Sequence, residues 1–153
     1  MTKNREELEK LAYGTLRFIQ EFKLAQNRRK DLDRVAFEIL MLIKLRGQIR
    51  PSDIAGELDF NPSSITRRIQ SLQQAGQIAV TTAPTDLRSS LISLTTEGEE
   101  VLIRFLNRSV DGLELILKQW NEEDVSVFAA MLSRFADTMK EWRLEPDQTE
   151  IKE

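Results

Sequence analysis

The stretch between residues 51 and 94 constrains the fold of this chain more than any other part. Pro51 and Asp53 suit the first turn of a helix, because proline lacks an N–H that this turn would leave unbonded and an acidic side chain faces the positive end of the helix dipole. Asn61 followed by Pro62 is a stronger start signal, since asparagine caps a helix and proline fits its first position. We therefore expect two short helices here, joined by a tight turn.

The second of these helices, from residue 62 to about 75, has one apolar face. Ile65, Ile69 and Leu72 recur at helical spacing, and Gly76 can close the helix. The polar and basic positions elsewhere on it are Ser63, Ser64, Arg67, Arg68, Ser71 and Gln74. A short helix that buries one face and presents a basic, hydroxyl-rich one is typical of the second helix of a helix-turn-helix.

The residues after this helix predict a β-hairpin. Residues 78–82 and 90–94 are short runs of β-prone residues, and the sequence APTDLRS between them carries the proline and aspartate of a turn. A hairpin directly after a helix-turn-helix makes the winged version of that motif.

Longer helices are expected on both sides of this stretch, over residues 5–26, 33–46 and 95 to about 118, and from Asn121 until Pro146 stops the last one. A polar break at 27–34 separates the first two. In the last helix the apolar residues alternate at spacings of three and four; they are Val125, Phe128, Leu132, Phe135, Met139 and Trp142. Such a seam needs another helix against it, either from a second copy of the chain or from within the same subunit.

The amino-acid inventory argues against an enzyme. The chain has neither cysteine nor histidine, which removes disulfides, thiol chemistry, the commonest zinc ligands and the usual general base. Its six glycines are scattered singly, so there is no glycine-rich phosphate loop. We therefore expect no catalytic site, no cofactor and no metal site.

The same inventory argues against a membrane location. No apolar run approaches the roughly 20 residues that span a bilayer. The N-terminal sequence MTKNREELEK is charged from its start and lacks the apolar core of a signal peptide. We expect a cytoplasmic protein with no membrane partner.

Charge is distributed unevenly along the chain. The net charge is −3, yet residues 1–90 hold 15 Lys and Arg against 11 Asp and Glu, whereas residues 91–153 hold 7 against 14. A basic N-terminal part and an acidic C-terminal part indicate that a polyanion would meet the former.

The residues at the start of the second short helix suit double-stranded DNA. The hydroxyls of Ser63, Ser64 and Thr66 fit phosphates or base edges in the major groove. Arg67 can contact guanine through two hydrogen bonds, and Arg68 can clamp a phosphate. The alternative for the two arginines is a solvated helix face.

Asp86 and Arg88 lie at the turn of the expected hairpin. Arg88 can enter a narrow minor groove, which attracts a guanidinium group. The alternative is a local salt bridge with Asp86, and the two are compatible if Asp86 orients Arg88.

These residues resemble the multiple-antibiotic-resistance regulator (MarR) family of prokaryotic winged-helix repressors. The wing of that family reads D-x-R followed by L-T-x-x-G, and residues 63–78 resemble its recognition-helix pattern, which ends in L-x-x-x-G-x-I/V. The wing residues that match are Asp86, Arg88, Leu94, Thr95 and Gly98. The helix order resembles the family over about residues 8–143.

The resemblance implies a fold that is mainly α with a small β-hairpin wing, and a homodimer with two DNA-binding lobes placed for a pseudo-palindromic site. It carries base reading onto Ser63, Ser64, Thr66 and Arg67, and the minor-groove contact onto Arg88. The expected organisation is one domain over 1–153: a winged helix-turn-helix lobe (33–94), dimerisation helices (5–26 and 95–143) and a flexible tail (146–153).

The family commonly senses small aromatic or phenolic compounds between its dimer helices and its DNA-binding lobe. The resemblance points to Arg17, Phe18, Phe22 and Arg46 as residues that bind such an effector, with burial in the core as the alternative for the aromatic pair.

The leading hypothesis is thus a DNA-binding transcription regulator, acting as a dimeric repressor that a small molecule can release. The alternative is a winged-helix protein-interaction module that no longer binds DNA. It draws on the acidic isoelectric point of about 5.2, and on Ile78-Ala79-Val80, where the family often has a basic residue. An enzyme comes third, because no candidate nucleophile has a base partner.

Overall fold

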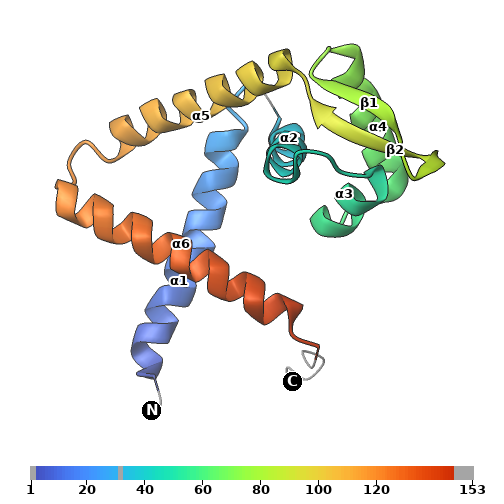
Figure 1. Cartoon of the computed structure of the whole chain (residues 1–153). Coiled ribbons are helices and arrows are strands. Elements are labelled where there is room, and N and C mark those ends of the chain that lie inside the picture. The colour runs from blue at the N-terminus through green and yellow to red at the C-terminus, as the bar shows by residue number, and fades with distance from the viewer. Residues whose placement is uncertain (1–2, 31–32, 147–153) are drawn as a thin grey trace. The chain divides into compact units, whose positions relative to one another are not determined.

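The computed structural model describes residues 3–30 and 33–146, and it is mainly helical with one β-hairpin (Figure 1). This confirms the predicted fold class. The chain divides into two compact units, Met1–Asn107 and Arg108–Glu153. The expected tail lies outside the described residues, apart from Pro146. The elements are α1 (Arg5–Gln26), α2 (Arg34–Arg46), α3 (Pro51–Leu58), α4 (Pro62–Gln74), β1 (Ile78–Ala83), β2 (Asp86–Leu94), α5 (Thr96–Ile116) and α6 (Glu122–Leu144).

Short polar side chains fix where the helices begin. The side-chain oxygens of Asp33, Asn61 and Asn121 each accept a backbone N–H from the first turn of the following helix, at 2.7–2.9 Å. These bonds satisfy donors that the start of a helix would otherwise leave unpaired. The starts that the sequence predicted for α4 and α6 are confirmed.

The helices α2, α3 and α4 and the hairpin pack together, and we call this part the lobe (Figure 1). Ile39, Leu40 and Ile43 of α2 are fully buried at its centre. The predicted apolar face of α4 is also confirmed, since its members are only 2–8% exposed: Ile65, Ile69 and Leu72. Among the described residues every buried side chain is apolar, so the lobe is held by hydrophobic packing.

The hairpin is longer than the sequence indicated, and it contains a bulge. Its antiparallel pairing runs from Ile78–Leu94 to Thr82–Ser90 and then shifts, so that Ala83 pairs with Asp86. The turn therefore narrows to residues 84–85, and residues 87–89 fall in the bulge of β2. The expected turn over 83–89 is shorter because Asp86 joins the ladder.

The short segment before α3 adds to the hairpin. Ile49 donates its N–H to the Ile92 carbonyl at 3.0 Å and accepts the N–H of Ile92 at 2.8 Å. Both side chains are buried. This pairing ties the connection between α2 and α3 to the middle of β2.

Thr95 and Gly98 join the hairpin to the end of α4. The Thr95 hydroxyl donates to the Gly76 carbonyl at 2.6 Å and accepts the Gly98 N–H at 3.1 Å, while the Thr95 N–H donates to the Gln77 carbonyl at 3.2 Å. A Cβ at position 98 would overlap the Gln77 carbonyl. The pattern L-T-x-x-G therefore combines a helix cap with the one residue type that lets two backbone segments meet.

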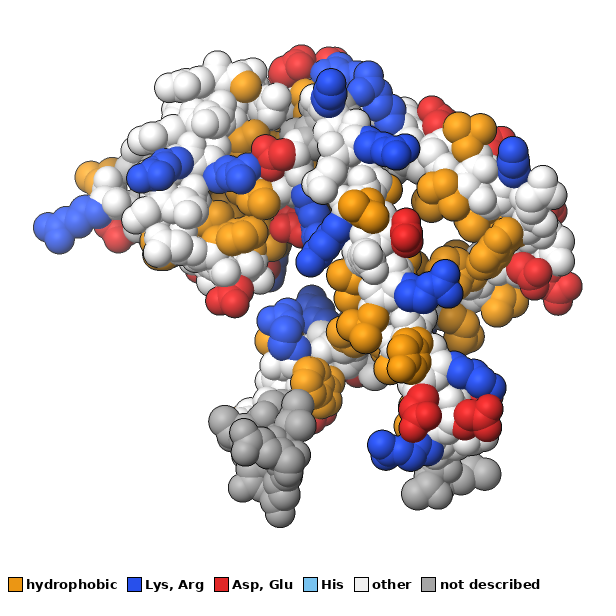
Figure 2. Space-filling model, turned by 180° about the vertical axis from the view of Figure 1, so that it is seen from behind, with side chains coloured by type: hydrophobic (Ala, Val, Ile, Leu, Met, Phe, Trp, Pro, Cys, Tyr) orange, Lys and Arg blue, Asp and Glu red, His pale blue; other side chains and the backbone are white. Residues whose placement is uncertain are grey.

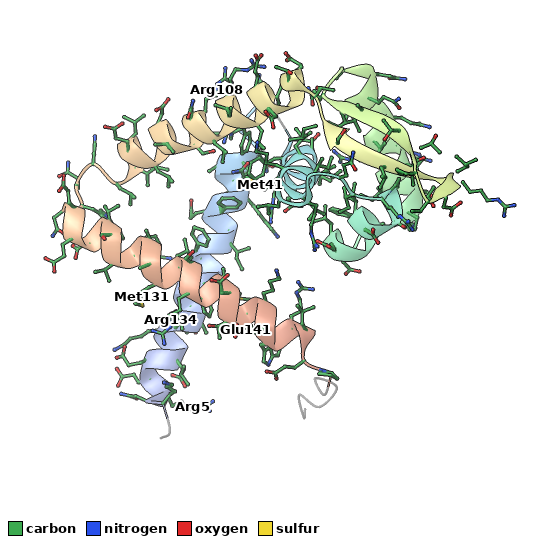
Figure 3. All side chains as sticks on the ribbon, in the orientation of Figure 1. Arg5, Met41, Arg108, Met131, Arg134 and Glu141 are labelled. Carbon is green, nitrogen blue, oxygen red and sulfur yellow. The ribbon has the colours of Figure 1, made fainter. Side chains whose placement is uncertain are left out.

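The long helices α1 and α6 contain no buried residue. Hydrophobic side chains accordingly lie at the surface of the long helical segments in Figure 2. Met131 of α6, labelled in Figure 3, is 51% exposed. In the described part of the chain, no helix has the length and apolar character required to traverse a bilayer.

Replacing Gly98 by alanine should destabilise the protein, because the new methyl group would overlap the Gln77 carbonyl oxygen. We expect the free energy of unfolding, measured by urea titration, to fall by about 1–3 kcal/mol, the usual cost of overpacking. Gly112→Ala is the matched control on the same helix, since a Cβ there meets no atom within 4 Å. It should be neutral or gain up to about 1 kcal/mol. Equal stability of the two variants would contradict the proposed fit.

Candidate nucleic-acid interface

The outer surface of α4 is polar because its apolar side chains are committed to the lobe. Ser63, Ser64 and Arg67 are exposed on it. Thr66 is exposed too, but its hydroxyl donates to the Pro62 carbonyl at 3.0 Å. It therefore offers a ligand its methyl group and its oxygen lone pairs rather than a donor.

The two adjacent arginines of α4 have different surroundings. The Arg67 side chain is exposed. The Arg68 guanidinium instead lies 2.7 Å from a carboxylate oxygen of Asp33, the residue that caps α2. The two arginines that the sequence analysis considered together thus differ: Arg67 is exposed, and Arg68 is paired with the cap of α2.

An open hollow of about 750 Å³ lies between the start of α2 and α4. Its walls include the hydroxyls of Ser64 and Ser71. Asp33 is the one carboxylate among the described residues that line it. Four cationic side chains also line it: Arg29, Lys30, Arg67 and Arg68. The hollow therefore carries an excess of positive charge beside the polar surface of α4.

Sequence reasoning missed Arg29 and Lys30, because residues 27–34 read only as a polar break between helices. The run of three basic residues was the available signal. Arg29 is held in place by Phe105 of α5: its guanidinium carbon lies 3.8 Å from the centre of that ring, and its Nη2 donates to the Phe105 carbonyl at 3.4 Å. The Phe105 ring in turn stacks on Phe37 at a centroid distance of 4.3 Å.

At the hairpin, Asp86 organises the bulge that contains Arg88. Its carboxylate accepts the backbone N–H of Arg88 and the hydroxyl of Ser89, each at 3.0 Å. These bonds hold the pKa of Asp86 below its ordinary value of 3.8. Asp86 thus acts on Arg88 through the backbone, and the Arg88 side chain in the bulge is exposed.

Of the four residues expected to bind an effector, the structure brings only Phe18 and Phe22 into contact with each other. The rings of Phe18 and Phe22 lie 5.7 Å apart on α1. The arginine found near them is Arg34, whose guanidinium carbon is 5.6 Å from the centre of the Phe22 ring. Arg46 pairs with Glu57 and so links α2 to α3. Arg17 is exposed on α1.

Known proteins share both the sequence pattern and the fold. The model of the MarR family matches residues 32–90. The HTH-type transcriptional regulator PecS of Dickeya dadantii is 35% identical over 101 residues, which are 64% of this chain and 61% of PecS. The chain thus spans about three fifths of the length of that relative.

Two solved structures show the same fold at lower identity. One is a mutant of MarR from E. coli complexed with operator DNA, at 20% identity and a TM-score of 0.61, covering 88% of this chain and 99% of that one. The other is the PcaV transcriptional regulator from Streptomyces coelicolor in complex with its natural ligand, at 21% identity and a TM-score of 0.60, covering 82% and 91%.

Asp86→Ala should loosen the hairpin tip, because it removes the acceptor of both hydrogen bonds in the bulge. We expect the Arg88 amide to exchange with solvent several-fold faster near neutral pH, as followed by NMR. Since the pKa of Asp86 is lowered, the protection that its carboxylate gives the Arg88 amide in the unmodified protein should be present above pH 3.8, the ordinary pKa. It should be lost as the pH falls through the lowered pKa.

Ser89→Ala is the control for this experiment. It removes only one of the two bonds to Asp86, so the Arg88 amide should stay better protected than in the Asp86 variant. Exchange in Asp86→Ala as slow as in the unmodified protein would show that the carboxylate does not order the tip.

Proposed function

We propose that the protein is a homodimeric transcription regulator, on the premise that its winged-helix segment, residues 32–90, matches the model of the MarR family. In this proposal it acts in the cytoplasm as a repressor on a pseudo-palindromic DNA site. PecS, its 35% identical relative, is named as an HTH-type transcriptional regulator, which supports a DNA-binding role rather than an enzymatic one.

The observation that carries the proposal is the division of α4 into two faces. Three apolar side chains anchor it in the lobe, so its capped N-terminal turn is held rigidly while the hydroxyls and Arg67 face outward. A helix of this kind can enter the major groove without disturbing its own packing. The MarR structure with operator DNA, at 20% identity, has this fold and supports the comparison.

We assign base reading to the first turns of α4, through Ser63, Ser64, Thr66 and Arg67. Thr66 would meet a thymine methyl group through its own methyl, since its hydroxyl hydrogen is bonded to Pro62. We assign the minor groove to Arg88, with Asp86 ordering its backbone.

A negative net charge does not oppose this assignment. The cations gather where DNA would lie, around the hollow beside α4, which includes Arg29, Lys30 and Arg67. Local potential rather than total charge governs the approach of a polyanion.

We propose that a second copy of the chain covers the long helices. Five apolar side chains of α6 at helical spacing remain 38–51% exposed: Phe128, Leu132, Phe135, Met139 and Trp142. Exposure of this extent is unusual for a monomer, and the spacing suits another helix. A twofold dimer would present two copies of α4, which matches an inverted repeat in DNA.

We propose further that a small aromatic effector regulates the protein. Phe18 and Phe22 form an aromatic pair on α1, and Arg34 lies near it. Two rings and a guanidinium suit an aromatic acid, and Arg17 and Arg46 are further cations that could bind its carboxylate. PcaV, which has this fold, is described in complex with its natural ligand.

Selection from a pool of random DNA duplexes tests the proposed function directly. We expect enrichment of an inverted repeat with half-sites about one helical turn apart, and an affinity that falls steeply with salt. The protein is unfolded and refolded beforehand, so that no effector co-purified with it blocks binding. Weak binding at low salt with no enriched sequence would contradict a regulator and favour a protein-interaction module.

Two arginine variants test the assignment of grooves. Arg67→Ala should weaken binding to the selected site by about 1–3 kcal/mol and relax the preference at one base pair. Arg88→Ala should weaken binding mainly where the flanks are rich in A·T pairs. Arg5→Ala, which removes the same charge at the start of α1, is the control and should change little. If Arg67→Ala weakens all sequences equally, Arg67 contacts phosphate rather than a base.

A further inference from the structure

Asp33 holds two groups with one carboxylate oxygen. Its Oδ1 accepts the Ala36 N–H at 2.9 Å and so caps α2. The same oxygen accepts Nη1 of Arg68 at 2.7 Å. Asp33 therefore joins the start of α2 to the middle of α4, and it does so through a cation on the proposed DNA-binding surface.

The surroundings of this pair are cationic. Arg29, Lys30 and Arg67 line the same hollow, and Asp33 is the one carboxylate among its described lining residues. Asp33 thus pairs with Arg68 at the place where a phosphate would bind. The Arg68 side chain is 41% exposed and that of Asp33 is 61% exposed. Solvent screens a pair this open, so a DNA phosphate can displace the carboxylate.

We propose that Asp33 restrains Arg68 and thereby limits how tightly the protein binds DNA of any sequence. In unbound protein the carboxylate keeps the guanidinium against α2. When the operator is bound, a correctly placed phosphate competes with Asp33 for the Arg68 guanidinium. When DNA of another sequence is bound loosely, its phosphates do not displace the carboxylate. Asp33 is then a specificity-determining residue that touches no base. The inference rests on the proposed function, because it presumes that α4 binds DNA.

The chain offers a variant that separates this role from helix capping. Asparagine caps a helix about as well as aspartate, so Asp33→Asn keeps the bond to the Ala36 N–H but loses the charge that holds Arg68. Glu38→Gln is the matched control. It lies on the same helix, removes the same charge and releases Arg34, which does not line the hollow.

The experiment measures binding to the selected operator and to a scrambled duplex of equal length, over a range of salt. Asp33→Asn should bind the scrambled duplex about two- to fivefold tighter at low salt, the factor that an exposed ion pair provides. Its preference for the operator over the scrambled duplex should fall. For the scrambled duplex, its plot of log affinity against log salt should steepen by about 0.9, because one more phosphate is contacted. Glu38→Gln should leave this slope unchanged.

Arg68→Ala completes a double-mutant cycle. If Asp33 acts through Arg68, Asp33→Asn should have no further effect on the slope when Arg68 is already alanine. The proposal is overturned if Asp33→Asn behaves like Glu38→Gln, if its effect persists without Arg68, or if it weakens binding. If Asp33→Asn unfolds at the same temperature as the unmodified protein, the change in DNA binding comes from the released arginine rather than from a damaged helix. Failure of the unmodified protein to bind either duplex would instead contradict the proposed function.

Discussion

The fit of Gly98 against the Gln77 carbonyl is the contact on which the geometry of the lobe depends. It brings the start of α5 against the residue that follows α4, and Thr95 secures the junction by bonding to both sides of it. Gly76, with a φ of 74°, lets the chain leave α4 toward β1. Both ends of the hairpin are therefore fixed to the same end of α4. The placement of Arg88 relative to Arg67 follows from this closure.

Local chemistry made much of this fold predictable. Caps, prolines and the spacing of isoleucines and leucines act within a few residues, so the order of the helices and the buried face of α4 could be derived from the sequence. The bulge in β2 could not, because the register of a hairpin depends on the whole ladder and not on its turn residues alone. The pairing of Ile49 with Ile92 was also missed, since it joins segments 43 positions apart.

The candidate site shows the same limit. The exposed residues of α4 followed from periodicity, whereas the difference between Arg67 and Arg68 depends on Asp33, which lies 35 residues earlier. Arg29 and Lys30 belong to a connection between helices, and only the packing of Phe105 and Phe37 explains how Arg29 is placed beside α4. Sequence patterns identify which residues share a helix face. They do not identify which charges meet across two elements.

The side chains that anchor α4 and those that it presents are separate sets. Ile65, Ile69 and Leu72 carry the packing, and the described core of the lobe includes no polar side chain that would couple it to the outer face. Descendants of such a gene can therefore exchange the outer residues of α4 one at a time and pass through folded proteins at every step. A duplicated copy can acquire a new DNA target without first acquiring a new core, which makes this scaffold well suited to diversification within a genome.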